Sequence, residues 1–230
     1  MDPLAGTPWS STSTVDGFAR TEPNRVLIDY ATHLVHPDRP ARAVDIGCGA
    51  GRNALPLARL GWHVLGTDLS RPMLRAAAAR VRSADLTGRL HLAMAPMESL
   101  PIADGSADLI VAHGIWNLAR SSTQMRQAIR EAARIARPGA ALFVFTFARH
   151  TLGPEAAPLP GETFVFSQFS GSPQCFLTAH QLRDEMADAG FAPDPAVPLT
   201  EYPRPTPGML RPITSPVIYE AAFRFQERTA

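Results

Sequence analysis

Glycine and acidic residues gather at one point in the sequence where they could bind a charged ligand. Gly47, Gly49 and Gly51 alternate there, with Asp45 two residues before the first glycine. Glycines let the backbone turn tightly and approach a ligand without a Cβ in the way. Because Asp45 would repel a pyrophosphate, the loop suits a ligand that carries an ammonium group better than a dinucleotide. Arg52 also stands where a G-x-G-x-x-G loop would have its third glycine.

The elements that must position this loop follow from hydrophobic periodicity. From residue 41 onward, short apolar runs alternate with amphipathic stretches, which predicts a parallel sheet covered by helices. Strands are expected over residues 41–46, 62–68, 90–95, 107–112 and 140–147, with a late antiparallel strand over 217–225. Helices are expected over residues 53–60, from the Ser70 cap onward, from Ser121 or Ser122 to about 136, and from the Thr178 cap onward. The glycine loop therefore lies between the first strand and its helix.

Three segments do not fit this alternation. Residues 1–40 form an N-terminal arm in which one helix is expected, over 24–35. Residues 149–177 and 192–216 are long connections rich in proline and glycine. Loops of this length in a compact domain are usually functional or disordered. We expect them to cover the carboxyl ends of the strands, where open α/β sheets bind ligands.

The glycine loop, Asp68 and residues 96–108 together resemble class I methyltransferases that use S-adenosylmethionine (SAM). The likeness is good over about residues 41–147 and weak over 178–225, and Arg52-Asn53 is similar to the tellurite-resistance and thiopurine-type branches. It implies a Rossmann-like three-layer α/β sandwich, whose seven-stranded sheet is mostly parallel with an antiparallel last strand. The domain would span residues 41–230, with the arm and the two long connections as lid elements.

The resemblance also implies which residues bind SAM and its product S-adenosylhomocysteine (SAH). Asp68 would accept both ribose hydroxyls, which suits a carboxylate with two acceptor oxygens. Arg52 would reach the SAM carboxylate or an anionic acceptor. Pro96 stands where many members have an aspartate, so adenine would rely on the Met97 amide and on Leu69. The expected cofactor contacts are Asp45, Gly47, Cys48, Gly49, Gly51, Arg52, Asp68, Leu69, Met97, Ala112 and His113.

Residues after the fourth strand are candidates for contact with the methyl acceptor. In the family this strand end faces the transferring methyl group, so His113 is either a base that deprotonates the acceptor or a hydrogen-bonded wall residue. Asn117 would hydrogen-bond the acceptor or else cap a turn. The candidates for acceptor binding are Trp116, Phe169, Tyr202 and Arg204, all of which also suit a core or an ordered loop.

Composition excludes several function classes. The 22 basic residues are all arginine, so Schiff-base catalysis by lysine and Walker-type phosphate binding are impossible. A net charge of +1 gives no general basic field for nucleic acid. Two cysteines make neither a disulfide framework nor a zinc site, and no metal is expected. Without an apolar stretch long enough for a bilayer or a secretory signal, a cytoplasmic protein is expected.

These observations favour an enzyme that transfers a methyl group from SAM to a small-molecule O, N or S nucleophile by in-line SN2 displacement. Two alternatives stay open. A catalytically silent partner protein with this fold would explain Pro96. An NAD-dependent oxidoreductase would share the sheet and Asp68, but Arg52 opposes it. The sequence leaves the oligomeric state open.

Overall fold

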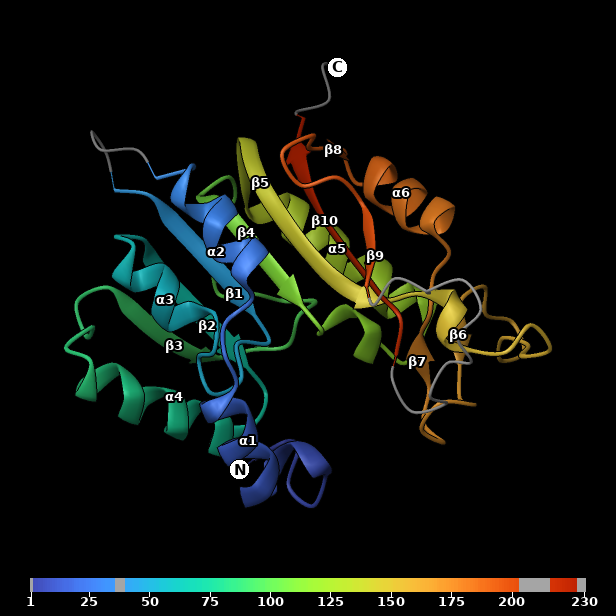
Figure 1. The fold of residues 1–230 in the computed structure, drawn as a ribbon, viewed down its shortest axis with the longest axis horizontal. Coiled ribbons are helices and arrows are strands. Elements are labelled where there is room, and N and C mark those ends of the chain that lie inside the picture. Colours follow the sequence, from blue (N-terminus) through green and yellow to red (C-terminus); the bar gives the residue numbers. More distant parts are fainter. Residues whose placement is uncertain (1, 36–39, 203–215, 227–230) are drawn as a thin grey trace.

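The computed structural model describes residues 2–35, 40–202 and 216–226. Its centre is a sheet in the order β3-β2-β1-β4-β5-β10-β8, with β9 also paired to β10 (Figure 1). The strands of this sheet are β1 (Arg42–Ile46), β2 (His63–Asp68), β3 (Leu90–Met94), β4 (Ala107–His113), β5 (Ala136–Phe147), β8 (Phe191–Pro193), β9 (Thr200–Tyr202) and β10 (Ile218–Phe225). The pairs among β1 to β5 are parallel, whereas β10 runs antiparallel to β5. The expected Rossmann-like sheet is thus confirmed, with β9 as an eighth strand beside the seven-strand path.

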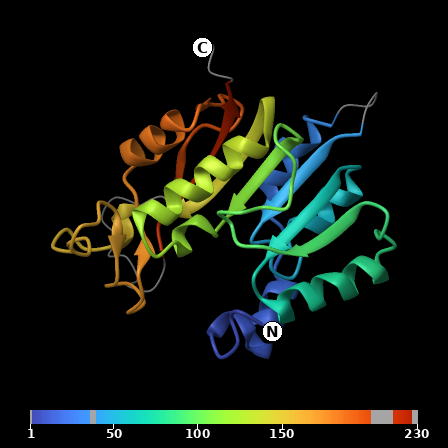
Figure 2. The same ribbon diagram turned by 180° about the vertical axis from the view of Figure 1, so that it is seen from behind.

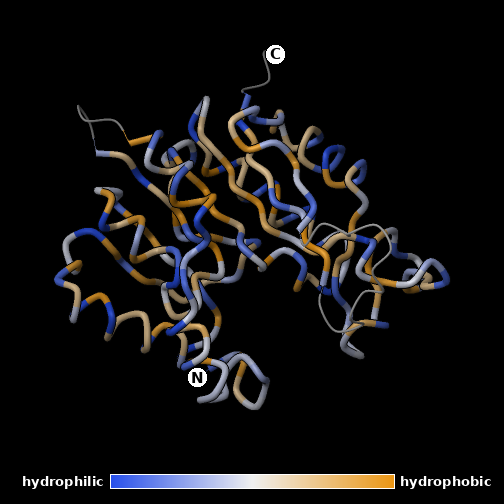
Figure 3. Tube along the Cα trace, in the orientation of Figure 1, coloured by the Kyte–Doolittle hydropathy of each residue, from blue (hydrophilic) through white to orange (hydrophobic). Residues whose placement is uncertain are grey.

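Helices cover both faces of the sheet. One buried cluster joins the sheet to α2 (Arg25–Thr32) and α3 (Ala54–Arg59), and a second joins it to α5 (Ser122–Ile135) and α6 (Ala179–Asp188). Figure 2 shows α5 and α6 on the side opposite α2. Because both faces are covered, the central strands are apolar along most of their length, as the colouring in Figure 3 shows.

The helices begin where short polar side chains cap them. Ser70 accepts from the Met73 N–H at the start of α4 (Arg71–Ser83), and Ser121 accepts from the Gln124 N–H at the start of α5. Thr178 and Gln181 form a reciprocal capping box on α6. Such caps satisfy backbone donors that have no partner inside the helix. The three helix starts agree with those expected from the sequence.

Several elements differ from expectation. The arm contains a second helix, α1 (Thr12–Arg20), and α2 is shorter than the expected 24–35. The connection 149–177 contains a small hairpin of β6 (Val165–Phe166) and β7 (Gln174–Cys175). In the connection 192–216, β8 and β9 pair with opposite ends of the outer edge of β10. β5 begins at Ala136, immediately after α5, because Gly139 adopts a positive φ of 78° that lets the strand continue.

The N-terminal arm is fastened to α4. Ser70 Oγ donates to the Trp9 carbonyl at 3.0 Å, and the Arg71 N–H donates to Asp2 Oδ1 at 3.2 Å. Val15 of α1 packs with Met73 of α4 in a small buried cluster. These contacts place α1 at the carboxyl ends of the parallel strands (Figure 1). The lid role of the arm stays a prediction.

Candidate functional site

The glycine loop follows β1 and has a left-handed backbone at each glycine. The φ angles are 69° at Gly47, 54° at Gly49 and 79° at Gly51, a region that side chains other than glycine rarely adopt. A Cβ on Gly51 would meet Leu55 at 2.3 Å, and one on Gly47 would meet Ile115 at 2.7 Å. Gly49 has only ordinary contacts around the place of a Cβ. The loop therefore needs glycine for conformation at all three positions and for space at two.

Asp68 ends β2 beside this loop. Its Oδ2 accepts from the Gly49 N–H at 2.9 Å, and its Oδ1 accepts from the Ser70 N–H at 2.8 Å. Burial raises the pKa of Asp68, although these N–H bonds favour the carboxylate and oppose the rise. The two bonds fix the orientation of the carboxylate. Leu69, between Asp68 and Ser70, is half-buried.

The buried Asp45 and the half-buried Arg52 interact as opposite charges at the glycine loop. Asp45 is 2% exposed, and its Oδ2 has no hydrogen-bond partner among the described residues. Burial raises the pKa of Asp45 to about 7, an effect that the nearby Arg52 charge partly opposes. Arg52 likewise has a buried Nε without a partner in the described part of the chain. Each member of the pair thus holds a polar atom for which the surrounding protein supplies no bond.

Unpartnered polar atoms gather along this edge of the sheet. Six of the seven buried side-chain atoms that lack a hydrogen bond among the described residues lie in or next to the carboxyl ends of β1, β2, β4 and β5. They belong to Asp45, Arg52, Thr67, Trp116, Asn117 and Thr146; the seventh belongs to Trp62. Since buried polar groups in native proteins are almost always bonded, such a cluster is a candidate site where a ligand or ordered water supplies the missing partners.

His113 ends β4 and faces Arg52. Arg52 Nη2 lies 2.8 Å from its Nδ1 and 3.4 Å from its Nε2, and Asn24 Nδ2 lies 3.2 Å from Nε2. The ring stacks on Phe145 with 4.1 Å between ring centroids. Burial, together with the Arg52 charge, lowers the pKa of His113 to about 3, so the ring is neutral at physiological pH. A histidine this weakly basic is a poor proton acceptor, and its role as a base stays a prediction.

The site also includes two residues, Asn24 and Glu220, that the sequence analysis did not identify. Asn24, the N-cap of α2, donates from Nδ2 to Glu220 Oε2 of β10 at 2.6 Å, and its backbone N–H donates to Asn53 Oδ1 at 3.0 Å. The arm, the glycine loop and β10 therefore meet beside His113. A charged residue within the otherwise apolar stretch 217–223 was the only sequence signal for Glu220.

The central part of the chain is similar to a known family. Residues 44–144 match the family model described as a methyltransferase domain. This part of the chain is a class I SAM-dependent methyltransferase domain. SAM is the cofactor of this family, and the family assignment predicted from the sequence is confirmed.

Relatives support the same assignment. Methyltransferase GfsG of Streptomyces halstedii is 34% identical over 140 residues, covering 59% of this chain and 48% of that protein. The 27-O-demethylrifamycin SV methyltransferase of Amycolatopsis mediterranei is 27% identical, covering 72% and 59%. The solved [4+2]-cyclase SpnF is similar with a TM-score of 0.59 and 26% identity, covering 76% and 62%. The chain thus spans about half to two thirds of these proteins, and they do not bear on the tellurite-resistance and thiopurine likeness.

The remaining predicted cofactor residues of the methyltransferase domain are buried. Cys48 is 6% exposed and its Sγ occupies the space beside Gly66, where a Cβ would meet it at 2.8 Å. Burial raises the pKa of the Cys48 thiol well above its ordinary value, so it stays a thiol. Met97 is 8% exposed in the segment after β3, and Ala112 is fully buried in β4. Their contacts with SAM stay predictions.

The predicted acceptor residues of the domain are dispersed. Trp116 and Asn117 are buried in a 3₁₀ turn directly after β4. Phe169 packs edge-on against Phe147, at the end of β5, with 5.5 Å between ring centroids. Tyr202, which ends β9, is 64% exposed. Arg204 lies outside the described residues. Their roles in binding the acceptor also stay predictions.

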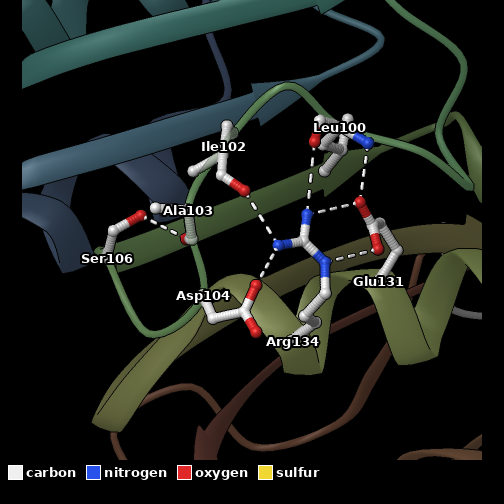
Figure 4. A network of polar contacts seen from close by, with 7 residues as sticks. All are labelled: Leu100, Ile102, Ala103, Asp104, Ser106, Glu131 and Arg134. Atoms are coloured by element: carbon white, nitrogen blue, oxygen red, sulfur yellow. Dashed lines mark hydrogen bonds and ion pairs between the residues drawn. The ribbon is translucent and has the colours of Figure 1, made fainter.

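A separate polar network fastens the segment that carries Met97. The Arg134 guanidinium donates to both carboxylate oxygens of Glu131, to Asp104, and to the carbonyls of Leu100 and Ile102 (Figure 4). Glu131 also accepts from the Leu100 N–H at 2.6 Å. Arg134 and Glu131 of α5 thereby hold the β3–β4 connection against the helix.

The described part of the chain holds neither a metal-binding cluster nor a membrane-spanning helix. In residues 2–35, 40–202 and 216–226, no group of three or more His, Cys, Asp or Glu side chains is placed to hold a metal ion. Within the same ranges, no helix has the length and apolar character needed to cross a bilayer.

Proposed function

We propose that this protein transfers the methyl group of SAM to a small-molecule nucleophile. The observation that carries the proposal is the buried, unpartnered Oδ2 of Asp45, which lies with Arg52 and Asp68 around the glycine loop of a methyltransferase domain. An unpaired buried carboxylate is costly unless a ligand completes its hydrogen bonds. The ammonium group of SAM is a suitable partner.

Each end of SAM has a group to receive it. Asp45 would bind the ammonium, Arg52 the carboxylate through its unpartnered Nε, and Asp68 the ribose hydroxyls. Adenine would lie between Leu69 and Met97. SAM supplies an electrophilic methyl on a sulfonium, which reacts by in-line displacement. The chain contributes position and exclusion of water, which supply much of the rate in such reactions.

A small-molecule acceptor fits the charge and the relatives. A net charge of +1 gives no broad basic field for RNA or DNA. Among the relatives, one is named as a methyltransferase of 27-O-demethylrifamycin SV, a small molecule. The N-terminal arm and the segments 149–177 and 192–216 would form lid elements of a domain at residues 41–230, of which residues 203–215 and 227–230 lie outside the described part of the chain. A cytoplasmic location is part of the same proposal.

Calorimetric titration tests the proposal. SAM, SAH and NADH are titrated into the wild-type protein, into Asp68→Ala and into the control Asp104→Ala, which removes an exposed carboxylate outside the site. We expect micromolar SAH binding by the wild type and the control, and at least about a tenfold loss in Asp68→Ala, since bonds to a charged group contribute about 1.5–3 kcal/mol. Tight NADH binding without SAH binding would instead support an oxidoreductase.

One observation favours a second candidate, a silent partner protein. The Ile115 side chain lies where a Cβ of Gly47 would be, so it covers the first glycine of the loop. If neither SAM nor SAH binds, this cover and Pro96 explain the failure, and Ile115→Ala should restore binding.

A further inference from the structure

The peptide group between Ala50 and Gly51, inside the glycine loop, is hydrogen-bonded on both of its sides. The Gly51 N–H donates to the Cys48 carbonyl at 2.9 Å. The Ala50 carbonyl accepts from Arg80 Nη1 at 2.7 Å, and among the described residues no backbone N–H donates to it. A side chain of α4 therefore completes the hydrogen bonds of this peptide.

The position of Arg80 is unfavourable for a charged side chain. Arg80 is half-buried, and burial lowers its pKa, as does the nearby charge of Arg59 on α3. None of the ion pairs among the described residues includes Arg80. The partner that this position does offer is the Ala50 carbonyl, and hydrogen bonds from a charged donor are stronger than neutral ones.

The bond restrains a peptide that has unusual backbone freedom. Gly51 has a φ of 79°, and glycine adopts positive and negative φ about equally readily. Without Arg80 the peptide would be held through its N–H alone, while Gly51 allows it other orientations. Arg52 follows directly in the chain, so the placement of its side chain depends on this peptide.

Arg80 acts on the loop from outside the expected ligand site. The Ser70 N–H bonds to Asp68, the residue proposed to bind the ribose. Arg80 lies about 15 Å farther along α4 than Ser70, at 1.5 Å per residue. Its guanidinium therefore reaches the glycine loop from the side away from the ribose, and we expect no contact between Arg80 and SAM.

We propose that Arg80 is a positioning residue for the amino-acid end of SAM. Its bond to Ala50 holds the glycine loop in the form in which Arg52 receives the carboxylate of the ligand. This inference rests on the proposed function and adds to it a residue that acts without touching the ligand.

The adenosine end of the site has bonds that do not involve Arg80. Asp68 is oriented by the Gly49 N–H at 2.9 Å and by the Ser70 N–H at 2.8 Å. The peptide that carries the Gly49 N–H is held at its other side as well, because the Cys48 carbonyl accepts from Gly51. Loss of Arg80 should therefore affect the two ends of the ligand unequally.

Binding of two ligands by calorimetry tests this inequality. SAH is compared with 5′-methylthioadenosine, which has the adenosine and the sulfur of SAH but neither its ammonium nor its carboxylate. We expect Arg80→Met to weaken SAH binding about tenfold, the size of one bond to a charged group, and to change 5′-methylthioadenosine binding less than about twofold. Equal losses for the two ligands, or an unchanged SAH affinity, overturn the inference.

A matched control separates the carbonyl bond from the charge. Arg82 also lies in the last turn of α4, where a positive charge interacts favourably with the helix dipole, but its side chain is exposed. We expect Arg82→Met to bind both ligands as the wild type does, and a loss of SAH affinity equal to that of Arg80→Met would overturn the inference. Arg80→Gln, whose side chain is too short for the carbonyl, should behave as Arg80→Met does. Methionine and glutamine are strong helix formers, so α4 should form in all three variants.

Amide hydrogen exchange followed by NMR tests the restraint in the ligand-free protein. We expect the Gly51 N–H to exchange at least about fivefold faster in Arg80→Met than in the wild type, measured relative to the buried Leu109 of β4. In Arg82→Met the ratio should stay that of the wild type. An unchanged ratio in Arg80→Met overturns the inference, because the peptide would then be held without the guanidinium.

Failure of this inference is distinct from failure of the proposed function. If the wild type does not bind SAH, the methyltransferase proposal is contradicted, and the positioning role with it. Normal SAH binding by the wild type that is equally strong in Arg80→Met overturns the role of Arg80 alone.

Discussion

Two arginines on the same domain are held in opposite ways. Arg134 uses its five N–H groups on two carboxylates and two backbone carbonyls. Arg52 contacts His113 and keeps a buried Nε without a partner in the described chain. Both lie next to a segment expected to contact SAM, so position alone does not separate them. The state of their hydrogen bonds does.

The difference indicates separate tasks. A guanidinium whose N–H groups are all bonded within the protein stabilises the fold, and it has few donors left for a ligand. A guanidinium with a buried, unpartnered N–H carries a desolvation cost that a ligand can recover. The Arg134 network is therefore interpreted as a fastener of the β3–β4 connection, and Arg52 as a ligand-binding group.

The largest expected effect is on folding. Arg134→Met should lower the free energy of unfolding by about 2–3 kcal/mol, because the buried carboxylate of Glu131 on α5 loses its charged partner. Arg52→Met should lower it by less than about 1 kcal/mol, since fewer bonds are lost. Urea unfolding monitored by circular dichroism measures both. Equal losses would contradict the comparison.

The second expected effect is on SAH binding, where Arg52→Met should have the larger effect of the two variants. Arg52→Met should weaken SAH binding about tenfold, which corresponds to one bond to a charged group at about 1.4 kcal/mol. Arg134→Met should change it less than about threefold. Calorimetry at a temperature where both variants are folded gives the two affinities. If Arg134→Met weakened SAH binding as much as Arg52→Met, the Arg134 network would be part of the cofactor site.

A third prediction concerns the proton on Asp45. Its pKa of about 7 in the folded protein lies above the ordinary 3.8, so the folded state holds the proton more tightly than the unfolded chain does. Its contribution to stability is therefore greatest below about pH 4, falls as the pH rises to about 7, and is level above that. The SAH ammonium favours the carboxylate, so binding at pH 7 should release about half a proton.

Calorimetry in two buffers of different ionisation enthalpy measures that release. Asp45→Asn keeps the shape and should abolish both the proton release and this pH dependence of stability. It should also weaken SAH binding, because the amide carries no charge. Proton uptake on binding to the wild type would show that the ammonium does not reach Asp45.

The smallest expected effect is the loss of stability when the exposed Asp104 is removed from the Arg134 network. The Asp104 side chain is 80% exposed, so Asp104→Ala should cost less than about 0.5 kcal/mol in urea unfolding. A loss as large as that of Arg134→Met would mean that the network acts as one unit and depends on its solvent-facing member.

Much of the sheet and part of the site could be predicted from sequence. The first five strands are apolar, and helices or a turn-rich connection separate them, so periodicity located them. Asp45, Arg52 and Asp68 meet because the carboxyl ends of neighbouring parallel strands share one edge. That argument needs only strand order and applies to any side chain at a strand end.

Other features depend on contacts that periodicity does not encode. α1 is largely polar and buries only Val15, so its sequence resembles that of an exposed loop. β8 and β9 are three residues long in a proline-rich stretch, too short to show alternation. Asn24 and Glu220 are 196 residues apart, and only the antiparallel return of β10 brings them together. Pairing of this kind is a property of the folded chain.

The way β10 is covered also affects how copies of this protein behave in concentrated solution. β8 and β9 close its outer edge in two short pieces, with Pro193, Pro195 and Pro198 in and between them. A three-residue strand gives a foreign chain little to extend, and proline has no N–H to offer it. This end of the sheet is therefore protected against the edge-to-edge growth through which β-proteins aggregate.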